Sequence, residues 1–314
     1  MIRLLYILYF AAAAAAVVLL AVRLAGDRLR RRRHPRERLL CRYAVRQIVS
    51  AQLSEEAAPV RLPLRRIVGR RHRLCELLSE LTAATYGLDA TPVRRLVRCY
   101  RLDRWLLRRA RLSRGCRRAR YLKWLADLPV ERAAAREAAR YLGDRCREVR
   151  FCALLVQIAA DPQQVLQSIA AFDPPLTEGE TAEVVHLLRR GLLPIAYRPL
   201  IESENENLCR LGLAIVERFG IEEAEPTLLR IVAEGSDACS AVALRTLVSM
   251  HRPLQRREVT ERVRRMPRAE LRALLHLLAR EGYAVGAVRH LFDTEERACY
   301  ESMVGSYKRQ LVWS

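Results

Sequence analysis

Apolar residues recur every three or four positions along almost the whole chain after residue 36, and no segment alternates apolar and polar residues convincingly. The first pattern is typical of amphipathic helices, whereas alternation is typical of strands. The clearest example is the stretch 205–232, where Gly220 separates two helical periods. Its apolar stripes are Leu208, Leu211, Ile215 and Phe219 before the glycine, and Leu228, Ile231 and Val232 after it. The chain is therefore predicted to be all-α, with a helical hairpin at 205–232.

Related patterns occur on both sides of this hairpin. Equating Val149, Cys209 and Cys239 gives offsets of 60 and 30, which indicates a repeat period near 30 with a weaker unit between the first two. Thr177 and Glu180 have the spacing of a capping box at a helix start. One hairpin cannot bury its apolar face alone, so hairpins of this kind stack into a solenoid. A compact, irregular helical bundle is the alternative that the same periods allow.

The residues of these hairpins resemble the HEAT-repeat family, in particular its short bacterial form. In that family the first helix begins with an acidic residue, a small apolar residue and an Arg, followed one turn later by Ala. Glu148, Val149, Arg150 and Ala153 match this order, and Cys209 and Arg210 stand at the corresponding positions of the later hairpin. The family's turn and second helix are similar to Gly220 followed by Ala224, Pro226, Leu228 and Leu229. The resemblance is clearest over 128–250, within a predicted repeat region of 124–314. It implies a helical solenoid with protein–protein interaction as its usual role.

The segment from Leu4 to Val22 contains no charged side chain. A helix of that length reaches about 28 Å, close to the thickness of the hydrocarbon core of a bilayer. We therefore expect a transmembrane signal-anchor helix over 1–24. A cleaved signal peptide is the alternative, but such peptides carry their positive charge before the apolar core.

The distribution of charge predicts the orientation of this anchor. Arg3 is the only charged side chain before it, whereas a cluster of arginines follows its end: Arg23, Arg28, Arg30, Arg31, Arg32, Arg33, Arg36 and Arg38. The positive-inside rule then places the N-terminus outside and the remaining chain in the cytoplasm, as a single-pass protein of the cell (inner or plasma) membrane. The nine cysteines are scattered, odd in number and without a CxxC pair, which agrees with a reducing compartment.

The net charge of +21 is concentrated in one part of the chain. Residues 23–123 hold 29 basic and 8 acidic residues, whereas 124–314 hold 26 and 27. Residues 25–123 are therefore predicted to form a basic membrane-proximal helical region that faces anionic lipid. Nucleic-acid binding is the second choice, because the arginines between 94 and 120 are interspersed with Tyr100 and Trp105 and followed by Tyr121, which could stack bases.

Signatures of catalysis are scarce. The sequence contains no GxxxxGK[ST], GxGxxG, HExxH or GxSxG motif. His72 and Cys75 share helical metal-ligand spacing, but a zinc site needs two further ligands, so a surface histidine and a buried cysteine are expected instead. The acidic run Glu202, Glu204 and Glu206 precedes a predicted helix, where it favours the positive end of the helix dipole rather than acid–base chemistry.

Together these patterns predict a membrane-anchored cytoplasmic scaffold or adaptor that is not an enzyme. It would bind protein partners through a HEAT-like surface and contact membrane lipid through its basic region. No cofactor, metal ion or small-molecule substrate is expected.

Overall fold

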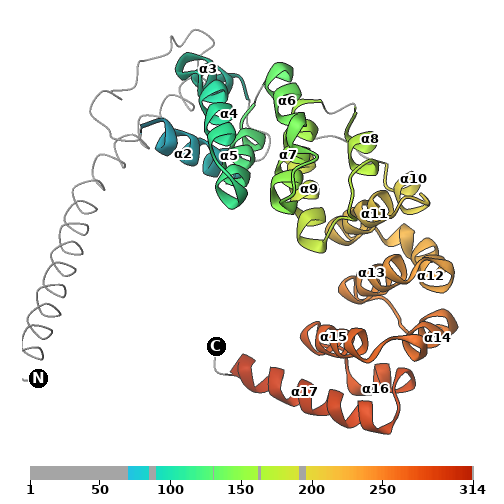
Figure 1. Cartoon of the computed structure of the whole chain (residues 1–314). Coiled ribbons are helices and arrows are strands. Elements are labelled where there is room, and N and C mark those ends of the chain that lie inside the picture. Colours follow the sequence, from blue (N-terminus) through green and yellow to red (C-terminus); the bar gives the residue numbers. More distant parts are fainter. Residues whose placement is uncertain (1–69, 85–89, 130, 162–163, 191–195, 313–314) are drawn as a thin grey trace, which may run out of the picture. The chain divides into compact units, whose positions relative to one another are not determined.

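The structure, a computed structural model, describes residues 70–84, 90–129, 131–161, 164–190 and 196–312 (Figure 1). No strand occurs within these ranges, which confirms the all-α prediction for them. None of the helices in these ranges is long and apolar enough to cross a membrane. The predicted anchor over 1–24 and the topology arginines from Arg23 to Arg38 lie outside them.

The chain divides into two compact units within helix α7, so that unit 1 ends at Val156 and unit 2 begins at Gln157. The boundary suggested by charge, after Lys123, lies inside helix α5. The described helices of unit 1 are α2 (Arg70–Ala84), α3 (Ala90–Tyr100), α4 (Leu102–Leu112), α5 (Gly115–Asp127), α6 (Arg132–Ala138), η2 (Ala139–Tyr141) and the first part of α7 (Arg147–Ala160). Helix α5 packs against α2 and α4, and α4 also contacts α3 and α6.

Unit 1 has a leucine-rich core that surrounds one buried carboxylate. Asp127 is 4% exposed. Its side chain accepts hydrogen bonds from the Ser79 hydroxyl (2.6 Å) and the Lys123 ammonium (2.8 Å), and its carbonyl accepts one from the Thr82 hydroxyl (2.9 Å). Because a buried charge without partners is costly, these bonds fix the end of α5 against α2.

Unit 2 consists of two rows of helices. After α7 the helices are α8 (Val165–Ala170), α9 (Glu178–Arg190), α10 (Arg198–Ile201), α11 (Glu206–Phe219), η4 (Glu222–Ala224), α12 (Glu225–Glu234), α13 (Asp237–Ser249), α14 (Arg257–Arg265), α15 (Arg268–Arg280), α16 (Val285–Val288), η5 (Arg289–Leu291) and α17 (Thr294–Val312). In the first row, α9, α11, α13, α15 and α17 each contact the next (Figure 1). In the second row, α12 contacts α14, and α14 contacts η5, which contacts α16.

The rows are held together by a continuous cluster of buried apolar side chains from Ile201 in α10 to Tyr300 in α17. Leu228, Ile231 and Val232 belong to this cluster, as the sequence predicts. Phe219 is a correction: its side chain is 56% exposed and lies under the guanidinium of Arg189. Phe219 is the last residue of α11 and lies beyond Ile215 and Val216, the last buried residues of this helix.

The turns that end three helices of the first row repeat with a fixed spacing. Gly220, His251 and Gly282 have φ angles of 61°, 54° and 78°, and the same interval of sequence separates each from the next. The amide of the following residue donates to a carbonyl five positions earlier in each case, at 3.0–3.1 Å, which is the Schellman motif. This interval is one position longer than the expected period near 30, and it equates Cys209 with Ser240 rather than with Cys239.

Side chains connect each turn to the previous one. Arg252 follows His251 and pairs with Glu222 at 2.8 Å. Tyr283 follows Gly282 and donates to the carbonyl of Arg252 at 3.1 Å, while its ring stacks on that of His251. Neighbouring repeats therefore make direct contacts at their turns as well as through the core.

Side chains cap the starts of helices α9 and α11, and the cap of α9 is the one that the sequence predicts. Thr177 and Glu180 form the predicted capping box: the Thr177 amide donates to the Glu180 carboxylate at 2.8 Å, and the Glu180 amide to the Thr177 hydroxyl at 3.3 Å. Asn205 caps α11 by accepting from the amides of Asn207 and Leu208. The acidic run before this helix thus ends with Glu206 in its first turn.

Asn207 attaches the loop before α9 to α11. Its side chain is 4% exposed, accepts from the Leu176 amide at 2.7 Å and donates to the carbonyls of Phe172 (2.7 Å) and Ile169 (3.2 Å). Both the oxygen and the nitrogen of this buried amide are therefore bonded to backbone groups.

Gly212 permits the close approach of α10 to α11. A Cβ atom at this position would lie 2.8 Å from the backbone nitrogen of Ile201 and 2.8 Å from the Cβ of Leu200. We expect Gly212→Ala to lower the free energy of unfolding by about 1–3 kcal/mol, because the two helices must separate. Urea denaturation measures this. Gly305→Ala in α17 is the matched control, since nothing lies within 4 Å of its Cβ; equal stability of both variants would contradict the packing argument.

Tyr300 predicts a specific loss of stability in alkali. It is 1% exposed, it donates to the Tyr283 carbonyl at 2.8 Å, and burial raises its pKa from 10 to about 12. Between these pH values the unfolded state releases the proton first, so stability present below pH 10 is lost as pH rises. Relative to Tyr300→Phe, the parent chain should lose up to about 3 kcal/mol more of its free energy of unfolding over this range. Parallel pH dependences in urea denaturation would contradict this.

Candidate functional site

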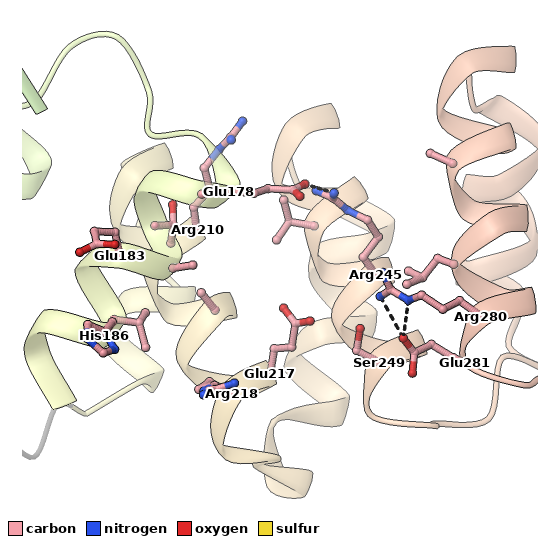
Figure 2. A pocket seen from close by; sticks show the side chains of 18 of the residues that line it. Glu178, Glu183, His186, Arg210, Glu217, Arg218, Arg245, Ser249, Arg280 and Glu281 are labelled. Atoms are coloured by element: carbon pink, nitrogen blue, oxygen red, sulfur yellow. Dashed lines mark hydrogen bonds and ion pairs between the residues drawn. The ribbon is translucent and has the colours of Figure 1, made fainter. Parts of the chain in front are cut away.

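A groove runs along the first row of unit 2, on the side of these helices that faces away from the second row. Its volume is about 1090 Å³. We call it the inner groove; all five helices of the first row contribute to its lining. Figure 2 shows lining side chains from α9, α11, α13 and α15. The lining residues that carry charge or can carry it are Glu178, Glu183, His186, Arg189, Arg210, Glu217, Arg218, Arg245, His276, Arg280 and Glu281.

The repeat seen at the turns explains why these side chains lie in one groove. Ala214, Arg245 and His276 are separated by the same interval as the turns, and they line the groove from α11, α13 and α15. Residues one repeat apart occupy the same face of successive helices, so the face opposite the buried stripe is presented in the same direction by each helix. Ala214 is small and leaves room between the longer side chains of its neighbours.

The groove carries both signs of charge in nearly equal number. Arg245 on α13 pairs with Glu178 on α9, so the two side chains meet across α11 (Figure 2). Arg280 pairs with Glu281 at 2.9 Å. Partial burial lowers the pKa of Arg245, and the charge of Glu270 opposes this shift. The guanidinium remains protonated because its ordinary pKa is far above neutrality.

Exposed polar side chains remain on the groove walls. Glu217, Arg218 and His276 are exposed, and within the described part of the chain no acidic or basic side chain pairs with Glu217 or Arg218. Such groups can pair with charges on a bound molecule without first losing a strong internal partner. The arrangement suits an elongated polar ligand with charges of both signs.

The residues of the HEAT-like signature mainly pack in the core or bind the backbone. Val149, Ala153, Cys209 and Leu228 are buried, Leu229 is half-buried, and Pro226 lies in the first turn of α12. Two signature arginines bind backbone carbonyls: Arg150 donates to Asp144 (2.8 Å) and Arg210 to Leu176 (2.9 Å). Arg210 is the one signature residue of this set that also lines the inner groove.

The other sequence candidates lie in unit 1 or outside the groove. Cys75 is buried, and desolvation raises the pKa of its thiol to about 12. His72 does not act with Cys75 but contacts the Trp124 ring edge to face. No group of three or more His, Cys, Asp or Glu side chains is placed to hold a metal ion in the ranges that the structure describes. Glu202 pairs with Arg230 at 3.4 Å, away from the groove lining.

The aromatic residues of the basic region pack mainly on one another. Trp105 and Tyr121 are half-buried with ring centres 6.0 Å apart in an edge-to-face contact.

The sequence analysis did not predict the inner groove. A signal was present in the polar residues Arg245 and His276, which lie one repeat apart, but only stacking brings them together.

Comparison with protein-family models, curated proteins and solved structures finds no significant match.

The ion pair between Arg245 and Glu178 is expected to contribute little to folding. Because Arg245 is 37% and Glu178 63% exposed, water screens their attraction. We expect Arg245→Ala to change the free energy of unfolding by less than about 1 kcal/mol. Denaturant titration measures this change, and a loss as large as that expected for Gly212→Ala would show instead that the arginine supports the fold.

Proposed function

We propose that the chain is a non-enzymatic scaffold or adaptor that binds a protein partner in the inner groove. A transmembrane helix over 1–24 would hold it at the cytoplasmic face of the cell membrane, and the basic region would face anionic lipid. The observation that carries the proposal is the groove itself, which extends over the five helices of the first row and has exposed charges on its walls.

The chemistry of the groove favours a protein segment over a polyanion. Five arginines and four glutamates line it, so it offers no uniform positive surface for a phosphate backbone. An extended or helical peptide with charges of both signs could pair along its length. The resemblance to HEAT repeats supports the same role, because that family usually binds proteins along a stacked-helix surface.

Nucleic-acid binding by unit 1 is the second candidate. The observation in its favour is the exposed arginines of helices α3 to α5: Arg94, Arg95, Arg98, Arg101, Arg104, Arg108, Arg109, Arg111, Arg114, Arg117 and Arg120. Only Arg98 and Arg111 of this set form ion pairs with described side chains, Glu131 and Glu137.

Site-directed photo-crosslinking in cells tests the proposal. A photoreactive residue replaces Glu217 or His276 in the groove, or Glu234 or Arg264 on the second row as controls. We expect the two groove positions to give the same protein adduct, resistant to nuclease, and the controls to give none. Combined Arg245→Glu and Arg280→Glu should reduce the adduct about tenfold, equivalent to about 1.4 kcal/mol of binding free energy.

Arg264→Glu with Arg265→Glu is the matched charge reversal, because both residues are exposed on α14 in the second row. It should leave the groove adduct unchanged. Equal adducts at groove and control positions, or adducts that disappear with nuclease, would contradict the proposal.

A further inference from the structure

The turn between α4 and α5 exposes a leucine among arginines. Leu112 is 71% exposed, more than any other large apolar side chain in the part of the chain that the structure describes. Arg108 and Arg109 precede it by one helical turn, and Arg114 and Arg117 follow across the turn into α5. All four arginines are exposed. We call Leu112 and these four arginines the basic tip.

Other contacts hold this turn in place. The Arg118 side chain donates to the Ala110 carbonyl at 3.1 Å and pairs with Asp144. Arg111 pairs with Glu137 at 2.6 Å. These two arginines therefore fix the end of α4 against α5 and α6. No described acidic side chain pairs with any arginine of the basic tip.

The combination of exposed arginines with one exposed leucine suits an anionic membrane better than a nucleic acid. A nucleic acid would use the arginines, but it gains little from one aliphatic side chain and binds single strands by stacking on aromatic rings. Trp105, on the same helix as Leu112, is half-buried against Tyr121 and has the Arg109 guanidinium 5.5 Å from its ring centre. An anionic bilayer instead offers phosphates for the arginines and hydrocarbon for the leucine.

We infer that the basic tip docks on the surface of an anionic membrane, with Leu112 inserted among the acyl chains and the arginines bound to lipid phosphates. This inference rests on the proposed membrane attachment and adds to it a defined contact site in unit 1. The tip would fix one end of unit 1 at the bilayer. A nonspecific attraction between many basic side chains and the lipid would instead leave the orientation of unit 1 free.

The test places benzoylphenylalanine at position 112 of the full chain and reconstitutes the protein into phosphatidylcholine vesicles that contain or lack phosphatidylglycerol. Mass spectrometry then identifies the adduct. We expect an acyl-chain adduct that increases at least about fivefold with phosphatidylglycerol and falls about tenfold in Arg114→Glu/Arg117→Glu, since each basic residue adds to lipid attraction. Both arginines are exposed, so the variant should melt like the parent.

Position 166 is the matched control, because Leu166 in α8 is 41% exposed. Equal adducts at 112 and 166, no lipid adduct at 112, or an adduct independent of phosphatidylglycerol would overturn the inference. When RNA is added to the vesicles, an RNA adduct at 112 that replaces the lipid adduct would do so as well. Carbonate extraction of the same vesicles reports anchoring, and crosslinking at Glu217 reports partner binding, so each part of the proposed function can fail separately.

Discussion

Burial of the apolar stripes between the two rows of helices is the interaction on which the rest of unit 2 depends. Cys209, Leu213 and Val216 in α11 and Leu228 in α12 belong to a cluster that continues into the next repeats. A single hairpin would leave part of this surface in water, so every repeat is stabilised by its neighbours. The inner groove is a consequence of the same packing, because its walls are the opposite faces of the helices that the core holds in register.

The turns at the ends of the first-row helices also connect neighbouring repeats. Gly220 and Gly282 adopt the left-handed conformation without a steric penalty, whereas His251 adopts it at a cost of about 1–2 kcal/mol. Its ring stacks on Tyr283 of the next turn and lies near Glu281, contacts that can offset part of that cost. A glycine at position 251 would relieve the backbone but would lose both contacts.

The local structure followed from the sequence more fully than the binding surface did. The two helices within 205–232, the capping box at Thr177 and the turn at Gly220 depend on short-range periodicity and backbone preferences, which the sequence displays directly. The packing partners of the second helix are α13 and α14 rather than α11, and the sequence does not display this. Phe219 was assigned to the wrong environment because a periodic pattern does not say where the last buried turn ends. The pairing of Glu178 with Arg245 joins residues that are distant in the sequence, and only the stacking of three helices brings them together.

The equal spacing of the turns also has a consequence for the evolution of the chain. Each helix of the first row contacts its neighbours in that row, and equivalent turns occur at Gly220, His251 and Gly282. If the segment between two such turns were duplicated or deleted, the helices brought together would present packing surfaces that already match. The groove could thereby be lengthened or shortened by one pair of helices in a single genetic event, with its partner range altered and its core chemistry retained.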